Sequence, residues 1–278
     1  MIDLHRFSLN RIVSPSLSLA KFYDLVISSG LRKVELRNDI GGKDPIDGMK
    51  SSEAMALAEE RGIEVVTINA LQKFNLASAR AKASAELDAM IELASTIGCK
   101  AIVLCPNNEA SDSRSQAQRA AETTEALVAY GPRFEKAGLF GYVEPLGFGI
   151  SSLASLVVAQ ECIKKSGFPC YKTVHDTFHH YIGPDDQSIL GAVYDIGYTG
   201  LVHISGVESD IAPSEYRDGH RVLVGPADRM KSKEQIQRLD QLGYTGVFSF
   251  EPFSPAVQKL GEADLVAVIK KSLSYLMS

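Results

Sequence analysis

The sequence lacks any CxxC pair, any basic leader followed by an apolar segment, and any apolar run close to the roughly 20 residues that span a bilayer. Without a CxxC pair, its four cysteines are expected to be small buried residues in a reducing compartment; they are Cys99, Cys105, Cys162 and Cys170. Without a leader or an apolar span, we expect a soluble, cytoplasmic protein that does not enter a membrane.

An excess of positive charge is also missing. The chain has 29 lysine and arginine residues against 34 aspartate and glutamate residues, a net charge of -5. A protein that binds a nucleic-acid backbone or an anionic membrane surface usually carries a basic patch. The charge therefore argues against both of these partners and leaves a small molecule as the expected ligand.

No linker, low-complexity tract or change in composition divides the 278 residues. With 45% apolar residues, a chain of this length can bury one large core. We therefore expect a single domain over residues 1–278.

One local pattern recurs along the chain: a helical segment, a glycine and a short strand. Each glycine suits the left-handed position that ends a helix, because it has no Cβ to clash with the backbone. The pattern occurs at seven glycines, Gly30, Gly62, Gly98, Gly138, Gly167, Gly197 and Gly243. A strand around His5 to Asn10 precedes them, and amphipathic stretches such as 262–276 lie between the strands. Eight strands that alternate with helices predict an α/β fold of the (β/α)8 TIM-barrel class.

A doubly wound open sheet is the competing architecture. It usually has a GxGxxG turn after its first strand, whereas this chain reads SLNRIVSPS there, so the barrel is preferred. Apolar and polar residues also alternate within the strands, as barrel strands require. Val34 and Val66 are expected toward the helices, and Glu35 and Asn69 toward the barrel interior. His175 would point outward, as a hydrogen-bonded core histidine.

Ligand-type side chains stand at the ends of four consecutive predicted strands, where a (β/α)8 barrel builds its active site. They are Glu144, Asp176, His203 and Glu251, and each glutamate is followed by a proline that holds it extended at the rim. Three carboxylates this close would repel one another unless a cation lies between them. We expect one divalent ion, and the oxygen-rich set suits Mn²⁺, Mg²⁺ or Co²⁺, with Zn²⁺ as an alternative. A salt-bridged rim without a metal is the competing interpretation.

The segments after the last two predicted strands lack the glycine-rich loops that bind phosphate. ISGVESD carries two acidic residues, and EPFSPAVQ carries two prolines and no glycine. Inward polar residues such as Glu35, Asn69 and Gln72 can instead hydrogen-bond neutral hydroxyls. The long connection from Ser205 to about Lys231 is expected to cover the site. The sequence therefore indicates an unphosphorylated polyhydroxy substrate.

The order of the strand-end motifs VEP, HDTFH, VHI and FEP resembles the xylose-isomerase-like TIM-barrel superfamily of sugar isomerases and epimerases, over nearly the whole chain. ELRND (35–39) and TINALQKFN (67–75) are most similar to its inosose (2-keto-myo-inositol) isomerase branch. The resemblance implies a metal-dependent isomerase of carbohydrate metabolism, in inositol catabolism, that acts through an enediolate. It implies a divalent ion such as manganese, no organic cofactor, and a polyol or ketose substrate. A homo-oligomer is compatible with it.

The resemblance also implies roles for particular residues. Four of them would bind the metal: Glu144, Asp176, His203 and Glu251. Two of these, Glu144 and Glu251, would also be catalytic and move the proton. Substrate contacts would come from His179 and Arg221, together with the inward residues Glu35, Asn69 and Gln72.

Three other functions are alternatives. One is a ketose 3-epimerase or a hydroxypyruvate-type sugar isomerase that uses the same site. The second is an endonuclease-IV-like phosphodiesterase, which needs more histidine ligands and a more basic groove than a chain with six histidines and a net charge of -5 offers. The third is a non-catalytic sugar- or metal-binding protein, which turnover of any ketose or inosose would exclude.

Overall fold

Eight parallel strands close into a barrel in chain order, and the last strand pairs with the first. The computed structural model describes residues 2–41 and 44–278. Its strands are β1 (Phe7–Asn10), β2 (Lys33–Arg37), β3 (Glu64–Leu71), β4 (Ala101–Leu104), β5 (Phe140–Val143), β6 (Tyr171–Asp176), β7 (Thr199–Ile204) and β8 (Val247–Phe250). Each strand lies beside its neighbours in the chain, so the predicted (β/α)8 fold is confirmed.

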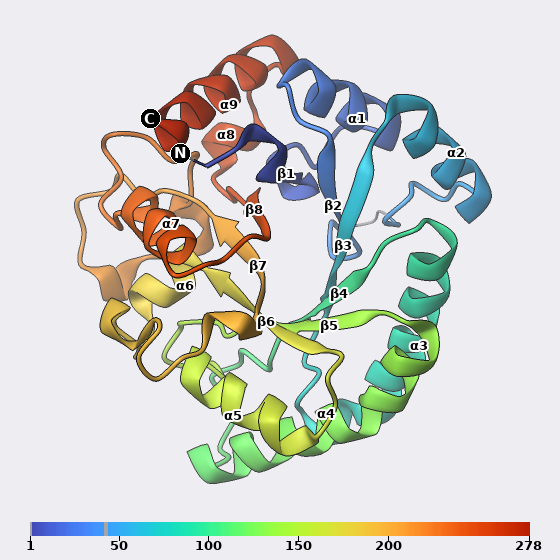
Figure 1. Ribbon diagram of the computed structural model, residues 1–278, viewed down its shortest axis with the longest axis vertical. Helices are drawn as coiled ribbons and strands as arrows, with labels where there is room; N and C mark the ends of the chain where they lie inside the picture. The colour runs from blue at the N-terminus through green and yellow to red at the C-terminus, as the bar shows by residue number, and fades with distance from the viewer. Residues whose placement is uncertain (1, 42–43) are drawn as a thin grey trace.

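Helices form a ring around the strands, as Figure 1 shows. They are α1 (Leu19–Ser28), α2 (Ser51–Arg61), α3 (Arg80–Thr96), α4 (Gln116–Ala137), α5 (Leu156–Ser166), α6 (Thr177–Ile182), α7 (Ser232–Gln241), α8 (Pro255–Gln258) and α9 (Glu262–Met277). Gly62 and Gly138 end α2 and α4 with left-handed φ angles of 61° and 65°, as the recurring pattern predicts.

Two predicted boundaries are wrong. The first strand begins at Phe7 rather than His5, because Leu4–Arg6 forms a 3-10 turn. Gly197 does not end an α-helix: it lies inside the 3-10 turn Ile196–Tyr198, and its backbone N–H donates to the side chain of Asp195. A 3-10 turn followed by a strand therefore gives the same glycine–strand pattern as an α-helix followed by a strand.

Apolar side chains fill two layers, one between strands and helices and one inside the barrel. The outer layer includes Leu36, Ile102 and Ile204, and the inner layer includes Val103, Val174 and Leu201. Val66 departs from the predicted alternation. It is an extra residue of β3 opposite the step from Val34 to Glu35, and it packs against the inner layer. The prediction that Val66 faces the helices is wrong, because a β-bulge resets the alternation.

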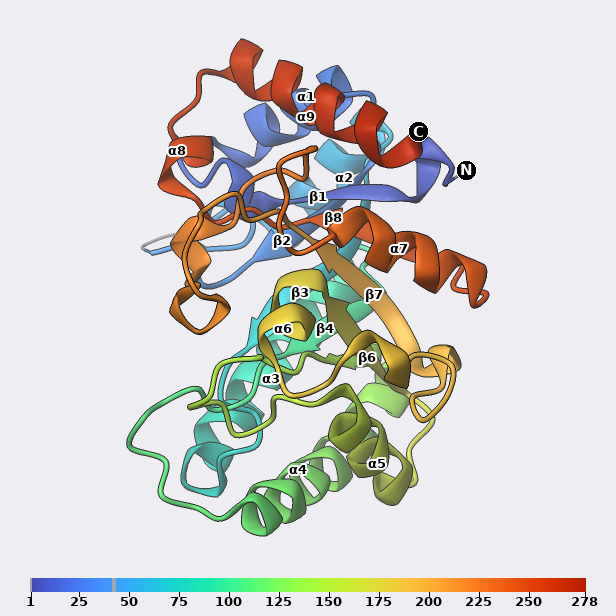
Figure 2. The same cartoon turned by 90° about the vertical axis from the view of Figure 1, so that its left-hand side faces the viewer.

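Long connections gather at the end of the barrel where the strands terminate. In Figure 2 the orange connection from β7 to α7 and the green connection from β4 to α4 lie on the same side of the molecule. The first of these runs over residues 205–231 and is built from 3-10 turns and irregular segments, as expected for a covering loop.

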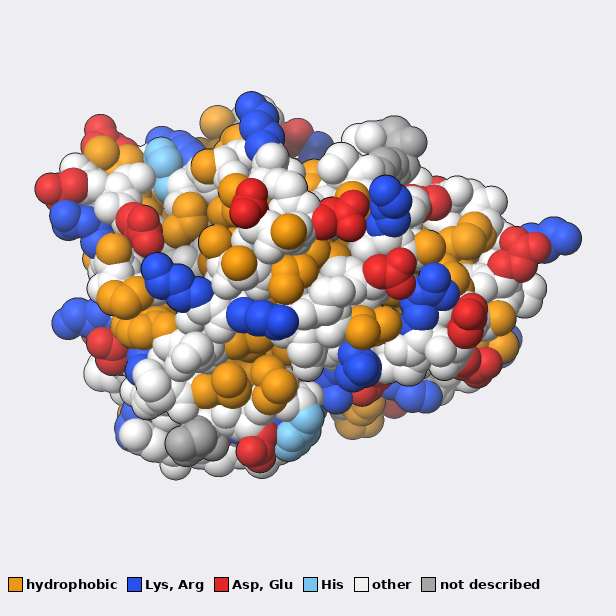
Figure 3. Space-filling view, turned by 90° about the horizontal axis from the view of Figure 1, so that it is seen from above, with side chains coloured by type: hydrophobic (Ala, Val, Ile, Leu, Met, Phe, Trp, Pro, Cys, Tyr) orange, Lys and Arg blue, Asp and Glu red, His pale blue; other side chains and the backbone are white. Residues whose placement is uncertain are grey.

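Basic and acidic side chains are interspersed on the face of the molecule shown in Figure 3. Apolar side chains lie between them on that face. Among the described residues, no helix is both long and apolar enough to cross a bilayer.

Candidate metal centre at the barrel mouth

Four neighbouring strands deliver the four predicted ligands to one place. Asp176 is the last residue of β6, His203 lies in β7, and Glu144 and Glu251 come directly after β5 and β8. Asp176 and His203 are register partners in the β6–β7 pair. All four side chains are buried, with at most 3% of each residue exposed. The parallel register therefore brings the strand-end residues together, as the sequence predicts.

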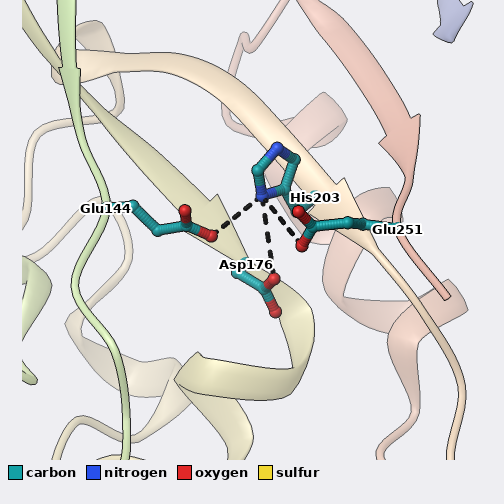
Figure 4. A group of neighbouring side chains, drawn as sticks. All are labelled: Glu144, Asp176, His203 and Glu251. Carbon is teal, nitrogen blue, oxygen red and sulfur yellow. Dashed lines mark hydrogen bonds and ion pairs between the residues drawn. The ribbon is translucent and has the colours of Figure 1, made fainter. Parts of the chain in front are cut away.

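The carboxylates converge on a single ring nitrogen of His203. Figure 4 shows Glu144, Asp176 and Glu251 around this nitrogen. Nδ1 lies 2.9 Å from Glu144 Oε1, 3.3 Å from Glu251 Oε2 and 3.8 Å from Asp176 Oδ2. One donor atom from each of the four residues lies within 4.8 Å of the others. Three carboxylate oxygens and one imidazole nitrogen at this spacing fit a divalent metal ion.

The other ring nitrogen of His203 faces Glu35. Nε2 lies 3.1 Å from a carboxylate oxygen of Glu35, which is fully buried. Thr67 donates a hydrogen bond to Glu35, and so does Asn10, over 3.3 Å. Glu35 therefore lies behind the histidine ring, on the side away from the other carboxylates.

Two arginines contact the same cluster. Arg221 donates from Nη2 to Asp176 Oδ2 (2.6 Å) and to Glu251 Oε2 (2.8 Å). Arg37 donates from Nη1 to Glu251 Oε1 (2.5 Å) and binds Asp39 through two further nitrogens. Both guanidinium groups lie about 5 Å from the centre of the Phe253 ring, at 5.2 and 4.8 Å. Arg221 was an expected substrate contact, whereas Arg37 was not among the site residues predicted from the sequence.

Glu251 and Asp176, the two cluster carboxylates that contact Arg221, have opposite pKa shifts. Burial raises the pKa of Glu251 to about 7, against the lowering effect of His203 and Arg221, and Glu144 adds to the rise. Burial also raises the pKa of Asp176, but the charges of Arg221, His179 and His203 outweigh it and hold that pKa below its usual value. In the metal-free protein the pKa of Glu251 therefore lies near neutral pH, while Asp176 stays ionised.

The other residues expected to contact the substrate lie at different depths in the barrel mouth. Asn69 Nδ2 lies 3.5 Å from Glu251 Oε1 inside the barrel. The backbone N–H of His179 donates to Asp176, and burial lowers the pKa of its ring, which contacts the ring of Phe148 at 5.1 Å between centroids. Gln72 is exposed and its Nε2 lies 3.4 Å from Asp39 Oδ2, so it lies at the rim.

His175 lies on the outer side of β6, as predicted. It is fully buried, its Nε2 lies 3.2 Å from Gln235 Oε1, and its ring centroid lies 4.7 Å from that of His180. Burial and the neighbouring His180 lower the pKa of His175 to about 3, against the weaker effects of Gln235 and Asp176. It is a neutral core histidine.

An open groove of about 1250 Å³ runs along the mouth beside the cluster. Phe148, Ile150 and Tyr216 supply part of its apolar wall, and Asp218 supplies a charged edge. Phe148 packs against His179, and Asp218 lies 3.3 Å from Arg221. Residues of the groove wall therefore touch His179 and Arg221, which in turn contact Asp176 of the cluster.

The fold and the cluster together define a (β/α)8 barrel with a candidate divalent-metal centre at the carboxyl ends of strands β5 to β8. The family model described as "Xylose isomerase-like TIM barrel" matches residues 23–278. The chain belongs to this family, as the sequence motifs predict.

Solved structures with the same fold cover almost the whole chain. A xylose isomerase domain containing protein from Salmonella typhimurium LT2 is 35% identical, with a TM-score of 0.93 over 100% of this chain and 99% of that one. The IolI protein, solved with a zinc atom, is 21% identical, with a TM-score of 0.87 over 98% of each chain. D-psicose 3-epimerase, solved in the presence of D-fructose, is 17% identical, with a TM-score of 0.75 over 97% of each chain. A search of curated proteins found no match.

Proposed function

We propose that this protein is a divalent-metal-dependent isomerase or epimerase of an unphosphorylated polyhydroxy ketone. The observation that carries the proposal is the convergence of three buried carboxylates on Nδ1 of His203. Inosose (2-keto-myo-inositol) is the leading substrate, supported by the motifs ELRND and TINALQKFN and by the fold shared with IolI. A ketose 3-epimerase, supported by the fold shared with D-psicose 3-epimerase, or a hydroxypyruvate-type isomerase is the alternative.

The residues that would hold the ion are Glu144, Asp176, His203 and Glu251. When bound, a divalent ion would stabilise the negative charge that develops on the substrate oxygens as the carbon-bound proton leaves. Mn²⁺, Mg²⁺ and Co²⁺ suit the oxygen-rich set, and the zinc atom of IolI supports Zn²⁺ as well.

Glu144 and Glu251 are the pair that would move the proton. Glu144 is oriented by His203 at one oxygen and by the thiol of Cys105, 3.4 Å away, at the other. Glu251 is held by Arg37 and Arg221, which fix the position of its carboxylate as the second acid or base. One glutamate would remove the proton beside the ketone, and the other would return a proton to the neighbouring carbon or oxygen.

The charge of the site favours a neutral substrate. Four buried carboxylates and two buried guanidinium groups surround it: Glu35, Glu144, Asp176, Glu251, Arg37 and Arg221. A divalent ion would add two positive charges, so the set would carry no net charge. A phosphate group would leave a buried excess of negative charge, which is costly in a low-dielectric interior.

Contacts to substrate hydroxyls would come from groups on three sides of the cluster. Arg221 and Asn69 reach the cluster directly, His179 lies beside Asp176, and Gln72 stands at the rim. The connection over residues 205–231 would cover the site, because it carries Arg221. We also propose that residues 1–278 act as one domain, since β8 pairs with β1.

Turnover assays in deuterated water test the proposal. The protein is loaded with Mn²⁺, Mg²⁺, Co²⁺ or Zn²⁺ and incubated with a panel of inososes, free ketoses and sugar phosphates. Deuterium should enter the carbon next to the ketone of the true substrate, and removal of the metal with a chelator should stop the exchange. A sugar phosphate that reacts far faster than every free ketone would refute the proposed substrate class. Metal binding without exchange into any compound would favour the non-catalytic binding protein.

A further inference from the structure

Glu35 contacts His203 on the opposite side of the ring from the candidate metal centre. Its carboxylate lies 3.1 Å from Nε2, whereas Glu144 lies 2.9 Å from Nδ1. The geometry points to Glu35 as a positioning residue that keeps a proton on Nε2 and so presents an unprotonated Nδ1 to the metal. This inference rests on the proposed metal centre and replaces the expectation that Glu35 touches the substrate.

A neutral imidazole carries one proton, and only the nitrogen without it can bind a cation. Around His203, carboxylates lie near both nitrogens, so Nδ1 could also hold the proton and donate it to Glu144. That tautomer would direct an N–H toward the metal position. A fixed acceptor at Nε2 favours the productive tautomer and orients the ring at the same time.

Neighbouring strands hold Glu35 in this position. In the strand register, Asn10 of β1 pairs with Glu35 of β2, and Glu35 pairs with Thr67 of β3. The side chains of Asn10 and Thr67 both donate to the Glu35 carboxylate. A group that receives two donors from its own neighbours remains an acceptor for a third donor, the Nε2–H of His203.

Burial separates Glu35 from the space where a substrate would lie. Its exposed fraction is 0%, and the ring of His203, also 0% exposed, stands between Glu35 at Nε2 and the oxygen of Glu144 at Nδ1. Glu35 therefore acts on the centre through His203 rather than through the substrate.

Metal affinity of Glu35→Gln tests the inference, because glutamine keeps the size of the side chain and loses its charge. Zn²⁺ and Mn²⁺ affinities are measured by competition with a chelator of known affinity. We expect a loss of about 10- to 100-fold, the range found when such supporting partners of metal ligands are changed. Glu64→Gln is the matched control, because Glu64 lies on neighbouring β3 but pairs with Lys33 on the surface, and it should bind as the unmodified protein does.

Nitrogen NMR of the histidine rings supplies a readout that a merely structural role would not move. In the zinc-loaded unmodified protein, His203 should show a proton on Nε2 and the metal on Nδ1. In metal-free protein, the Nε2 proton should appear as a hydrogen-bonded resonance that weakens in Glu35→Gln. Equal affinities of the variant and the unmodified protein, or a proton found on Nδ1 in the loaded protein, would overturn the inference. Failure of the unmodified protein to bind any of the metals would instead refute the proposed metal centre.

Discussion

Arg221 and Asp176 form an ion pair of 2.6 Å in which both side chains are at most 1% exposed. Removing one partner from such a pair leaves an unpaired buried charge, which typically costs about 3–5 kcal/mol. We therefore expect Arg221→Ala to lower the free energy of unfolding of the metal-free protein by about that amount. A bound divalent ion would restore positive charge at the same oxygens, so added Mn²⁺ should raise the melting temperature more in this variant than in the unmodified protein.

Calorimetry with and without Mn²⁺ measures both effects. Arg229→Ala is the control, because its pair with Asp210 is exposed and such pairs contribute about 0–1 kcal/mol. An equal response of Arg221→Ala and the unmodified protein to the ion would show that the ion does not bind beside Arg221.

His203→Ala should abolish tight metal binding, because it removes the nitrogen on which the three carboxylates converge. Elemental analysis after gel filtration gives the metal content per chain. His5→Ala is the control, since the His5 side chain is 73% exposed. Unchanged metal content in His203→Ala would mean that the ion binds elsewhere.

Replacement of Glu144 or Glu251 by glutamine should lower turnover about 10²- to 10⁴-fold, the usual contribution of a positioned acid or base. Both residues are also candidate ligands, so rates must be divided by the bound metal. The exposed Glu161→Gln provides the control, because Glu161 pairs with Lys164 on the surface of α5. If both variants kept normal turnover per bound metal, the two-glutamate mechanism would be wrong.

Protonation of His180 should lower the free energy of unfolding as the pH decreases. Burial lowers the pKa of His180, against the effect of the nearby Asp185 and Asp186, and the neighbouring His175 is held neutral. A lowered folded-state pKa means that the unfolded chain binds the proton first. Stability is therefore fully present above about pH 6.5 and is lost below it, by at most about 1.4 kcal/mol per pH unit for one group.

Urea unfolding between pH 5 and 7 measures that slope. His180→Gln should show a shallower slope than the unmodified protein, whereas His5→Gln should keep the original slope. If the free energy of unfolding depended on pH with the same slope in His180→Gln and in the unmodified protein, the prediction would be contradicted.

Gly147→Ala should disturb the turn after β5. A Cβ at Gly147 would lie 2.0 Å from the backbone oxygen of His179, so the turn and α6 would have to separate. Overpacking of this kind costs about 1–3 kcal/mol, and the shift of His179 should also lower turnover. Gly149→Ala is the control, because a Cβ there meets nothing within 4 Å. Equal melting temperatures of the two variants would rule out the steric effect.

Strand-end residues were predictable because a closed parallel barrel places every strand terminus on one rim. Glu144, Asp176, His203 and Glu251 therefore come together without any knowledge of loop structure. The glycine–strand pattern likewise locates the strands, because a glycine that ends a helix depends on local backbone geometry.

Details that depend on several strands at once were not predictable. The β-bulge at Val66 changes which face a residue takes, and no local residue pattern marks it. Alternation in KVELR places Glu35 and Arg37 inward but cannot assign their partners. Only the register of β1, β2 and β3 directs Glu35 to His203, while Arg37 of β2 reaches past β1 to Glu251 after β8.

Glu251 follows the last strand, yet its hydrogen-bond partners Asn10 and Arg37 belong to the first two strands. An ion bound to Glu251 would therefore stabilise the pairing of β8 with β1, which closes the barrel. Ligand binding to the folded state alone adds about 2.7 kcal/mol at a free concentration of 100 times the dissociation constant. Separation of β8 from β1 should thus be slower and less frequent when the metal is bound.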